Sequence, residues 1–310
     1  MLFEALVLTF AQATGVAKVA AMTREHDTRI WRVLEHHLHA ARDRADFSGV
    51  RKVGMDETSA AKGQDYVSIF ADLAAGRVLF ATEGPSADTV AAFAADLAEH
   101  GGDPERVSDT SSDMSTASIA GIGEHLPNAR MTFDRYHLAA KLSEAVDQVR
   151  RTEVTTRPEL KHTRWLWLKN WSNLSRTQRR ELHRLVRPSA QLATTRALRW
   201  REDFQAFYDQ DPSLCARLPA PLVLRRQTQP PPNRSRTSSP SSSATATPVL
   251  AWHANHLTNG LLEGINSLVQ AAKARARGYR NKDKMITIVY LIAAKLPLPT
   301  VTNPAPVYMA

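Results

Sequence analysis

Three short apolar segments follow one another closely between residues 50 and 84, and they constrain the fold more than any other feature of the chain. They are VRKVGMDET at 50–58, DYVSIFADL at 65–73 and GRVLFATEG at 76–84, separated by turn residues. Runs rich in Val, Ile and Phe with this spacing are typical of β-strands. The connections are too short for crossover helices, so neighbouring strands should run antiparallel. The sequence therefore predicts a three-stranded meander.

Two strand units with intervening helices follow the meander. Residues 86–101 and 116–127 have the composition and capping of helices, and residues 106–115 and 129–133 resemble a fourth and a fifth strand. A long helix is expected over residues 134–153. A meander followed by strand units of this kind predicts a mixed α/β sheet.

Helices are expected on both sides of this region. Residues 2–22 and 26–42 predict two helices, the second capped near Asp27 and Thr28, which could form part of a helix-turn-helix. Residues 140–210 contain no strand signal. The tryptophans of that segment could stack on bases, but aromatic residues in helices more often belong to the core, which is what we expect of Trp165, Trp167 and Trp171.

The charge of the chain is concentrated in one segment. The net charge is +9, yet residues 150–201 alone contain 14 lysines and arginines and three glutamates. A segment this basic favours a polyanionic partner, and nucleic acid is the leading candidate, with Arg179 and Arg180 among the expected phosphate contacts. A merely solvated helix surface would normally carry balancing acids.

Other classes of protein are excluded by composition. No apolar run approaches the roughly 20 residues of a membrane span, and the absence of a targeting segment predicts a cytoplasmic protein. The one cysteine, Cys215, excludes an intramolecular disulfide framework and a cysteine-cluster zinc site. Residues 212–248 are dense in Pro, Ser, Thr and Arg, as in a disordered linker.

The segment LTNGLLEGINSLVQAAKARARGYRN at 257–281 predicts an amphipathic helix. Its apolar stripe would comprise Leu261, Ile265, Leu268, Val269 and Ala272. Its polar face begins with one acid, and it would comprise Glu263, Asn266, Gln270, Lys273 and Arg277. The bases expected to bind phosphate are Lys273, Arg275, Arg277 and Arg280.

Three carboxylates could form one site. Asp56 lies inside the first strand, where a buried acid is costly unless it is paired or binds a metal. Asp113 follows the fourth strand, and the two acids would approach one another if these strands are neighbours. Glu263 would complete an oxygen-rich site for two divalent cations, which suits phosphodiester chemistry. Taken singly, each acid is more often a cap or a surface carboxylate than a metal ligand, and spacing alone does not establish the triad.

Three long motifs, in order, resemble bacterial insertion-sequence DDE transposases of the ISL-three family. They are GMDETSAAKGQDYVSIFADLAAGRVLF, SSDMSTASIAGIGEHLPNARMTFDRYHL and the 257–281 segment. The resemblance covers residues 3–210 and 250–297 approximately. It implies a ribonuclease-H-like core interrupted by an α-helical insertion. It also implies DNA cleavage and joining dependent on Mg²⁺ or Mn²⁺, with two ions held by Asp56, Asp113 and Glu263.

The resemblance also includes Asp134 and His137 in FDRYHL. Asp134 is the main alternative to Asp113 as the second catalytic acid. His137 could contact a phosphate or a flipped base, or it could be a histidine satisfied at a helix start.

The chain departs from the family in two places. It lacks the cysteine-rich zinc-binding start of such proteins, which suggests an N-terminally truncated copy. Residues 212–248 replace helical, tryptophan-bearing sequence, and either a pair of compensating frameshifts or a natural linker would explain them. Damage to the insertion would loosen Glu263 relative to the aspartates, so a defective copy is one of the hypotheses.

The sequence thus predicts a DNA transposase that acts in the bacterial cytoplasm, at the nucleoid, as a homo-oligomer on paired ends. Its partners would be the terminal inverted repeats and target DNA. Alternatives are an inactive DNA-binding remnant that acts as an inhibitor, and a related metal-dependent nuclease. The predicted divisions are a partial helix-turn-helix at 1–45, core at 46–140, basic helical insertion at 141–211, disordered segment at 212–249, final core at 250–297 and tail at 298–310.

Overall fold

The computed structural model describes residues 1–61, 65–84, 87–113, 115–187, 191–208, 251–252 and 255–302. The chain divides into two compact units, which are described separately: residues 1–132 with 257–310, and residues 133–256. The predicted disordered segment at 212–249 lies outside the described residues. None of the helices in these ranges is long and apolar enough to cross a membrane.

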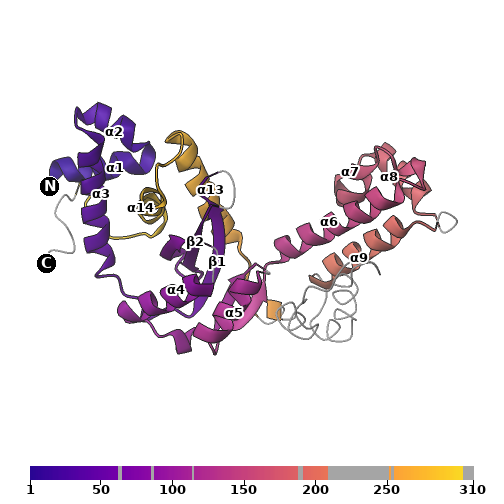
Figure 1. The fold of residues 1–310 in the computed structure, drawn as a ribbon, viewed down its shortest axis with the longest axis horizontal. Helices are drawn as coiled ribbons and strands as arrows, with labels where there is room; N and C mark the ends of the chain where they lie inside the picture. The colour runs from indigo at the N-terminus through magenta and orange to yellow at the C-terminus, as the bar shows by residue number, and fades with distance from the viewer. Residues whose placement is uncertain are drawn as a thin grey trace. The chain divides into compact units, whose positions relative to one another are not determined.

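The first unit begins with three helices, α1 (Leu2–Ala13), α2 (Val16–Thr23) and α3 (Asp27–Arg42) (Figure 1). The single helix predicted over residues 2–22 was wrong, because the backbone is extended at Thr14 and Gly15. The cap of α3 also differs from the prediction. Asp27 is already helical, and the side chain of His26 accepts a hydrogen bond from the Thr28 amide instead.

The sheet has five strands in the order β3-β2-β1-β4-β5. The meander is confirmed: β1 (Lys52–Ser59) runs antiparallel to β2 (Tyr66–Asp72), which runs antiparallel to β3 (Arg77–Glu83). The fourth strand, β4 (Asp109–Ser112), runs parallel to β1, and β5 (Arg130–Phe133) lies beyond it. The mixed α/β sheet predicted from the sequence is therefore present, with the strand order of a ribonuclease-H-like core.

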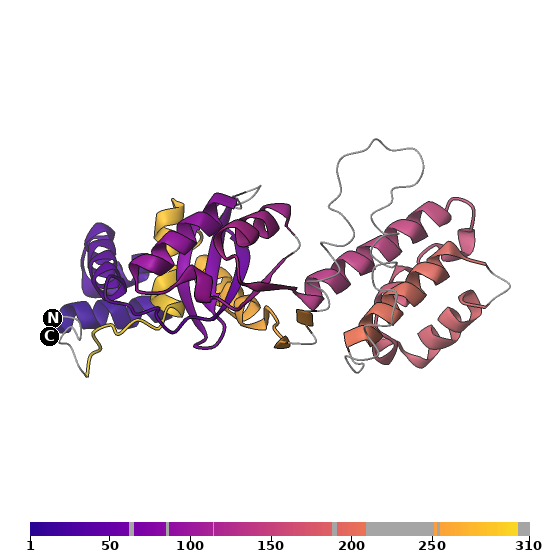
Figure 2. The ribbon, with the colours of Figure 1, turned by 90° about the horizontal axis from the view of Figure 1, so that it is seen from below.

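Helices cover both faces of this sheet (Figures 1 and 2). Helices α4 (Ala87–Glu99) and α5 (Thr116–His125) pack on one face, where Phe93 and Ile122 meet Met55 and Phe70. A short 3₁₀ turn, Pro104–Arg106, precedes β4. Helices α13 (Gly260–Arg275) and α14 (Lys282–Ala293) pack on the other face against alternate residues of the strands such as Ile69.

The apolar stripe predicted for the 257–281 helix was partly wrong. Ile265, Val269 and Ala272 are buried as expected, but Leu268 is 56% exposed and Leu262 is fully buried in its place. The reason is the sheet: α13 turns Leu262 toward Gly54 of β1, where a glycine leaves room for it. A Cβ atom built on Gly54 would lie 2.7 Å from Leu262 Cδ1.

We expect Gly54→Val to lower the free energy of unfolding by about 1–3 kcal/mol, because the added methyl groups would overpack the contact between β1 and α13. Urea denaturation of the full chain measures the change. Gly49→Val is the matched control, since no atom lies within 4 Å of a Cβ built there. Equal stability of the two variants would show that α13 does not pack closely on β1.

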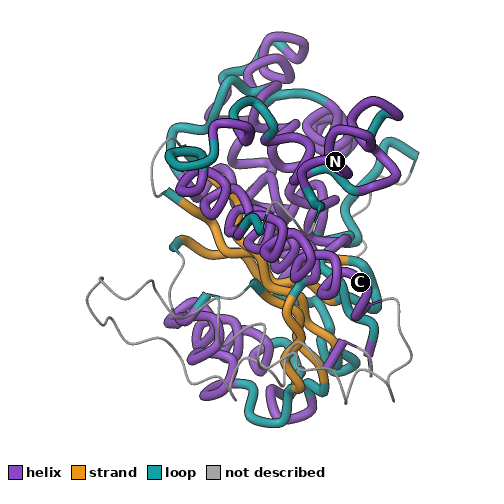
Figure 3. The backbone as a smooth tube through the Cα atoms, turned by 90° about the vertical axis from the view of Figure 1, so that its right-hand side faces the viewer, coloured by secondary structure: helices purple, strands orange, loops and turns teal. Residues whose placement is uncertain are grey.

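The second unit, beyond Phe133, consists of helices and loops in its described part (Figure 3). Its core contains Val146, Leu160, Trp167, Leu182 and Leu198. Its elements are α6 (Arg135–Glu153), a 3₁₀ turn at Pro158–Leu160, α7 (Arg164–Leu168), a 3₁₀ turn at Trp171–Asn173, α8 (Arg176–Leu185) and α9 (Ala193–Tyr208).

The three tryptophans of this unit do not share one environment. Trp167 is buried, as expected, and its indole N–H donates to Thr163 Oγ1. Trp165 and Trp171 are 57% and 46% exposed, so assigning them to the core was wrong. The guanidinium groups of Arg164 and Arg179 lie over the rings of Trp165 and Trp171. These cation–π contacts stabilise the two aromatic rings at the surface.

Candidate active site

Asp56 lies in the middle of β1, on the face covered by α13. Its side chain is half-buried, Oδ1 accepts a hydrogen bond from the Glu57 amide at 2.8 Å, and Oδ2 accepts one from Asn266 Nδ2 at 2.8 Å. Asn266 belongs to α13, so this bond ties the carboxylate of the strand to the helix that carries Glu263. The orientation of Asp56 is therefore fixed from both sides.

Asp113 follows β4 directly, next to Asp56 across the sheet. The parallel register pairs Gly54 with Ser111, and two residues further on each strand lie Asp56 and Asp113. Asp113 Oδ1 accepts a hydrogen bond from the Ser115 amide at 3.0 Å, in the turn that precedes α5, so Asp113 does not cap that helix, whose N-cap is Ser115. The proximity of the two strand ends follows from the sheet order rather than from spacing in the sequence.

The pKa of Glu57, the residue after Asp56 on β1, reflects the charge near the end of β4. Burial raises the pKa of its carboxyl group, and the negative charges of Asp113 and Asp56 raise it further. Carboxylates raise one another's pKa only when they lie within a few ångströms or share a poorly solvated site. The electrostatic potential is therefore negative where the end of β4 lies beside the middle of β1, and a negative potential favours a bound cation.

Glu263 lies on the stripe of α13 that faces β1. Asn259, four residues before it, donates to the Met55 carbonyl at 3.4 Å, and Asn266, three residues after it, donates to Asp56. Further along the stripe, Gln270 donates to Thr58 Oγ1 at 2.9 Å. Residues three and four apart share one helix face, so Glu263 lies between two contacts to β1. Its side chain is exposed.

The donors at this site suit a hard divalent cation. Among the described residues, no three His, Cys, Asp or Glu side chains are grouped closely enough to hold a metal ion. Two buried amide oxygens, Asn259 Oδ1 and Asn266 Oδ1, have no hydrogen-bond partner in the described part of the chain, and their residues flank Glu263 along the sequence. Carboxylate and amide oxygens are the ligands that Mg²⁺ and Mn²⁺ prefer, so the chemical types of these donors suit such an ion, while the three acids are not gathered around one point in this structure.

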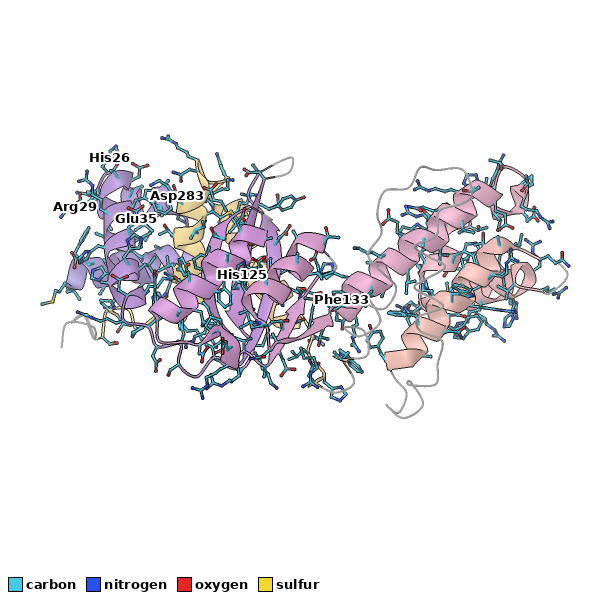
Figure 4. All side chains as sticks on the ribbon, turned by 60° about the horizontal axis from the view of Figure 1, so that its bottom comes forward. His26, Arg29, Glu35, His125, Phe133 and Asp283 are labelled. Atoms are coloured by element: carbon cyan, nitrogen blue, oxygen red, sulfur yellow. The ribbon has the colours of Figure 1, made fainter. Side chains whose placement is uncertain are left out.

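Asp134 and His137 belong to the second unit. Asp134 is fully buried at the start of α6, where Oδ1 accepts a hydrogen bond from the Tyr136 amide at 3.0 Å. It follows Phe133, the first residue of that unit, which is labelled in Figure 4. Asp113 and Asp56 share the first unit, so the two candidates for the second acid lie in different units.

A family model of ISL3-type DDE transposases, described as "Transposase", matches residues 53–289 of the chain. The match includes β1 from Val53 on, the other four strands of the sheet and α13. The chain belongs to this transposase family. It is also similar to the transposase for insertion sequence element IS1001 of Bordetella parapertussis, with 28% identity over 254 residues. That alignment covers 79% of this chain and 62% of the relative, so the chain spans less than two thirds of the relative's length.

The basic residues expected to bind phosphate in this transposase chain differ in their exposure and in their hydrogen bonds within the protein. Arg275, Arg277 and Arg280 are exposed, whereas Lys273 is half-buried and its Nζ donates to the Ser59 carbonyl at 2.8 Å. Lys273 thus holds α13 on β1. In the second unit, Arg180 is exposed, while the Arg179 guanidinium donates to the carbonyls of Trp171 and Ser172.

Two arginines of the basic segment are structural. Arg201 is 2% exposed and donates to the carbonyls of Trp167, Leu168 and Lys169, which end α7. Arg150 is buried against Asp147, with Nη2 and Oδ1 2.7 Å apart. Net charge along the sequence therefore overstates the basic surface of this unit.

Asn266 and Gln270 lie on the polar face predicted for their helix, but the sequence predicted no function for either residue. The structure gives both a contact to β1. The available signal was their spacing, since Asn266 and Gln270 continue the stripe of Glu263 at three and seven residues.

Proposed function

We propose that the chain catalyses divalent-metal-dependent cleavage and strand transfer at the ends of an insertion sequence. The observation that supports this proposal is the parallel register of β1 and β4, which pairs Gly54 with Ser111 two residues before Asp56 and Asp113, together with the hydrogen bond from Asn266 of the Glu263 helix to Asp56. Two acids at one strand end and a third on the covering helix are the residue types that phosphodiester chemistry requires. Membership of a transposase family supports the same conclusion.

Asp56, Asp113 and Glu263 would hold the metal ions, with Asp56 oriented by Asn266. When bound, Mg²⁺ or Mn²⁺ supplies Lewis-acid stabilisation of the attacking and leaving oxygens. Partial burial limits the solvation of Asp56 and Asp113 and strengthens their interaction with a cation, whereas Glu263 is exposed. Rigid support from β1 and α13 keeps the carboxylates in place, which matters because an ångström of displacement can cost about a hundredfold in rate.

The proposed reaction has two steps. In the first, water attacks the phosphorus at the element end, the bond to the 3′ oxygen breaks, and that oxygen leaves as a 3′ hydroxyl. In the second, this hydroxyl attacks a phosphodiester of target DNA and displaces another 3′ oxygen. Neither step needs a covalent bond between protein and DNA. The partners are the terminal inverted repeats and target DNA, and pairing of two ends implies a homo-oligomer.

Incubation of the full chain with the DNA that flanks its own coding sequence tests the proposal. We expect strand cleavage in Mg²⁺ or Mn²⁺, none in EDTA, and a cut position that primer extension maps to the element end. Binding of DNA without cleavage under any metal condition would contradict the proposal and favour an inactive DNA-binding protein. Cleavage at unrelated positions without strand transfer would favour a metal-dependent nuclease.

Asn266→Ala should weaken Mn²⁺ binding about 10- to 100-fold, because residues that orient a metal ligand typically contribute this much. The alanine removes the hydrogen bond to Asp56 Oδ2 and the nearby amide oxygen. Isothermal calorimetry measures the affinity without DNA or turnover. Ser267→Ala, the exposed neighbour on α13, should bind Mn²⁺ as wild type does. If Asn266→Ala binds Mn²⁺ with the wild-type affinity, Asn266 does not contribute to the metal site.

A further inference from the structure

A groove of about 970 Å³ lies in the first unit, between the helices at the N-terminus and the loop that follows α13. Its walls come from the start of α2, the start of α3 and residues 275–280, with Lys284 of α14. We name it the basic groove after six of its lining residues: Lys18, His26, Arg275, Arg277, Arg280 and Lys284. It is separate from the carboxylate site, which lies toward the other end of α13.

The walls of the basic groove are held together by specific contacts. The Arg275 guanidinium donates to the Ala13 carbonyl at 2.8 Å, and a Cβ atom on Gly15 would lie 3.4 Å from Ala276 Cα. Trp31 packs edge-on to Tyr279, and Lys284 Nζ lies 4.0 Å from the centroid of the Trp31 ring. Segments far apart in the sequence thus form one preorganised surface, which lowers the entropic cost of binding.

The charge of the groove is unbalanced. Within the described part of the chain, none of its five lysines and arginines forms an ion pair with a carboxylate. Its two acids are otherwise engaged: Glu25 pairs with Arg29 at 2.6 Å, and Asp27 lies 3.1 Å from His26 Nδ1. Figure 4 shows His26 and Arg29 at the beginning of α3. Clustered cations without acidic partners are typical of a surface that binds a polyanion.

Two backbone features add to this potential. Helix α2 has no side-chain cap at Gly15. The Lys18 and Val19 amides donate to the Gly15 carbonyl, and the first two helical residues, Val16 and Ala17, line the groove at the positive end of the helix dipole. Arg277 has a left-handed conformation, with φ of 57°, in the turn that ends α13. This conformation ends α13, where the Gly278 amide donates to the Lys273 carbonyl, and it directs the chain from the helix into residues 277–280 of the groove wall.

We propose that the basic groove binds the phosphodiester backbone of duplex DNA at a fixed distance from the reacting phosphate. This inference rests on the proposed function for the position of that phosphate. Arg275 follows Glu263 by twelve residues of α13, which corresponds to about 18 Å along the helix axis. At about 3.4 Å per nucleotide, the groove contacts the backbone about five nucleotides from the cleaved bond.

The first test measures the salt dependence of DNA binding. The double variant Arg277→Gly, Arg280→Ala removes two exposed cations, and glycine suits the left-handed position of Arg277. Arg44→Ala, Arg106→Ala removes the same charge from exposed sites outside the groove. Binding of a random-sequence duplex in EDTA should show a slope of log K against log[KCl] lower by about two for the groove variant only. Thermal unfolding checks that both variants fold.

The second test locates the contact. Neutral methylphosphonates are placed singly from two to eight nucleotides from the mapped cut. We expect the wild type to lose affinity most near the fifth nucleotide, and the groove variant to lose none there. An equal salt slope in the two double variants, or a methylphosphonate effect that persists in the groove variant, would overturn the proposal. Wild-type cleavage in the same preparations would show that the proposed function stands without the groove.

Discussion

Replacing Glu263 by glutamine should lower the rate of metal-dependent strand cleavage by about a thousandfold or more, while DNA binding is retained. The substitution preserves size and removes only the charge that would complete the metal site, and electrostatic groups at reacting oxygens contribute effects of this order. Glu263 is exposed, so its loss should not unfold the chain. Single-turnover cleavage of the mapped element end measures the rate.

Glu124→Gln is the matched control, because Glu124 is also exposed and lies at the end of α5 on the other face of the sheet. It should cleave at the wild-type rate. If Glu263→Gln cleaves as fast as wild type in Mg²⁺, Glu263 is not a metal ligand, and another acid must complete the site.

Arg201→Met should lower the free energy of unfolding by about 3 kcal/mol, the largest stability effect that we expect in the second unit. The guanidinium donates to three carbonyls at the end of α7 while nearly all of it is buried. Methionine fills much of the same volume but leaves these carbonyls without donors, and unsatisfied buried polar groups cost about 1–3 kcal/mol each. Chemical denaturation followed by tryptophan fluorescence reports the change, because Trp167 packs beside Arg201.

Arg199→Met tests whether the effect comes from burial rather than from charge. Arg199 lies two residues away on α9 and is exposed, so its substitution should change stability by no more than about 0.5 kcal/mol. Similar losses for the two variants would mean that Arg201 acts through the net charge of the segment.

The local pattern of the sequence predicted the sheet because each strand is short, apolar and bounded by turn residues. The meander follows from that pattern and from the lengths of the connections. The parallel pairing of β1 with β4 was not predicted, and the approach of Asp56 to Asp113 was expected only on the condition that these strands are neighbours. The break between α1 and α2 could not be predicted this way. Gly15 lies against Ala276, which is 261 positions later in the chain.

The contacts that orient the site are also long-range. The hydrogen bond between Asn266 and Asp56 joins residues 210 positions apart, and nothing in the composition of either segment indicates it. The same limit applies to Arg201, which counts as a surface cation in the sequence but is buried in the fold. Charge and periodicity describe an element by itself, whereas the partner of a buried polar group depends on packing.

The most direct test of the carboxylate site compares Mn²⁺ binding by Asp113→Asn and Asp134→Asn in the full chain. Isothermal calorimetry of each variant against wild type separates the two acids, one from each unit. We predict that Asp113→Asn loses most of the affinity and that Asp134→Asn retains it. Loss of affinity in Asp134→Asn with wild-type binding in Asp113→Asn would contradict the proposed site and assign the second acid to the start of α6.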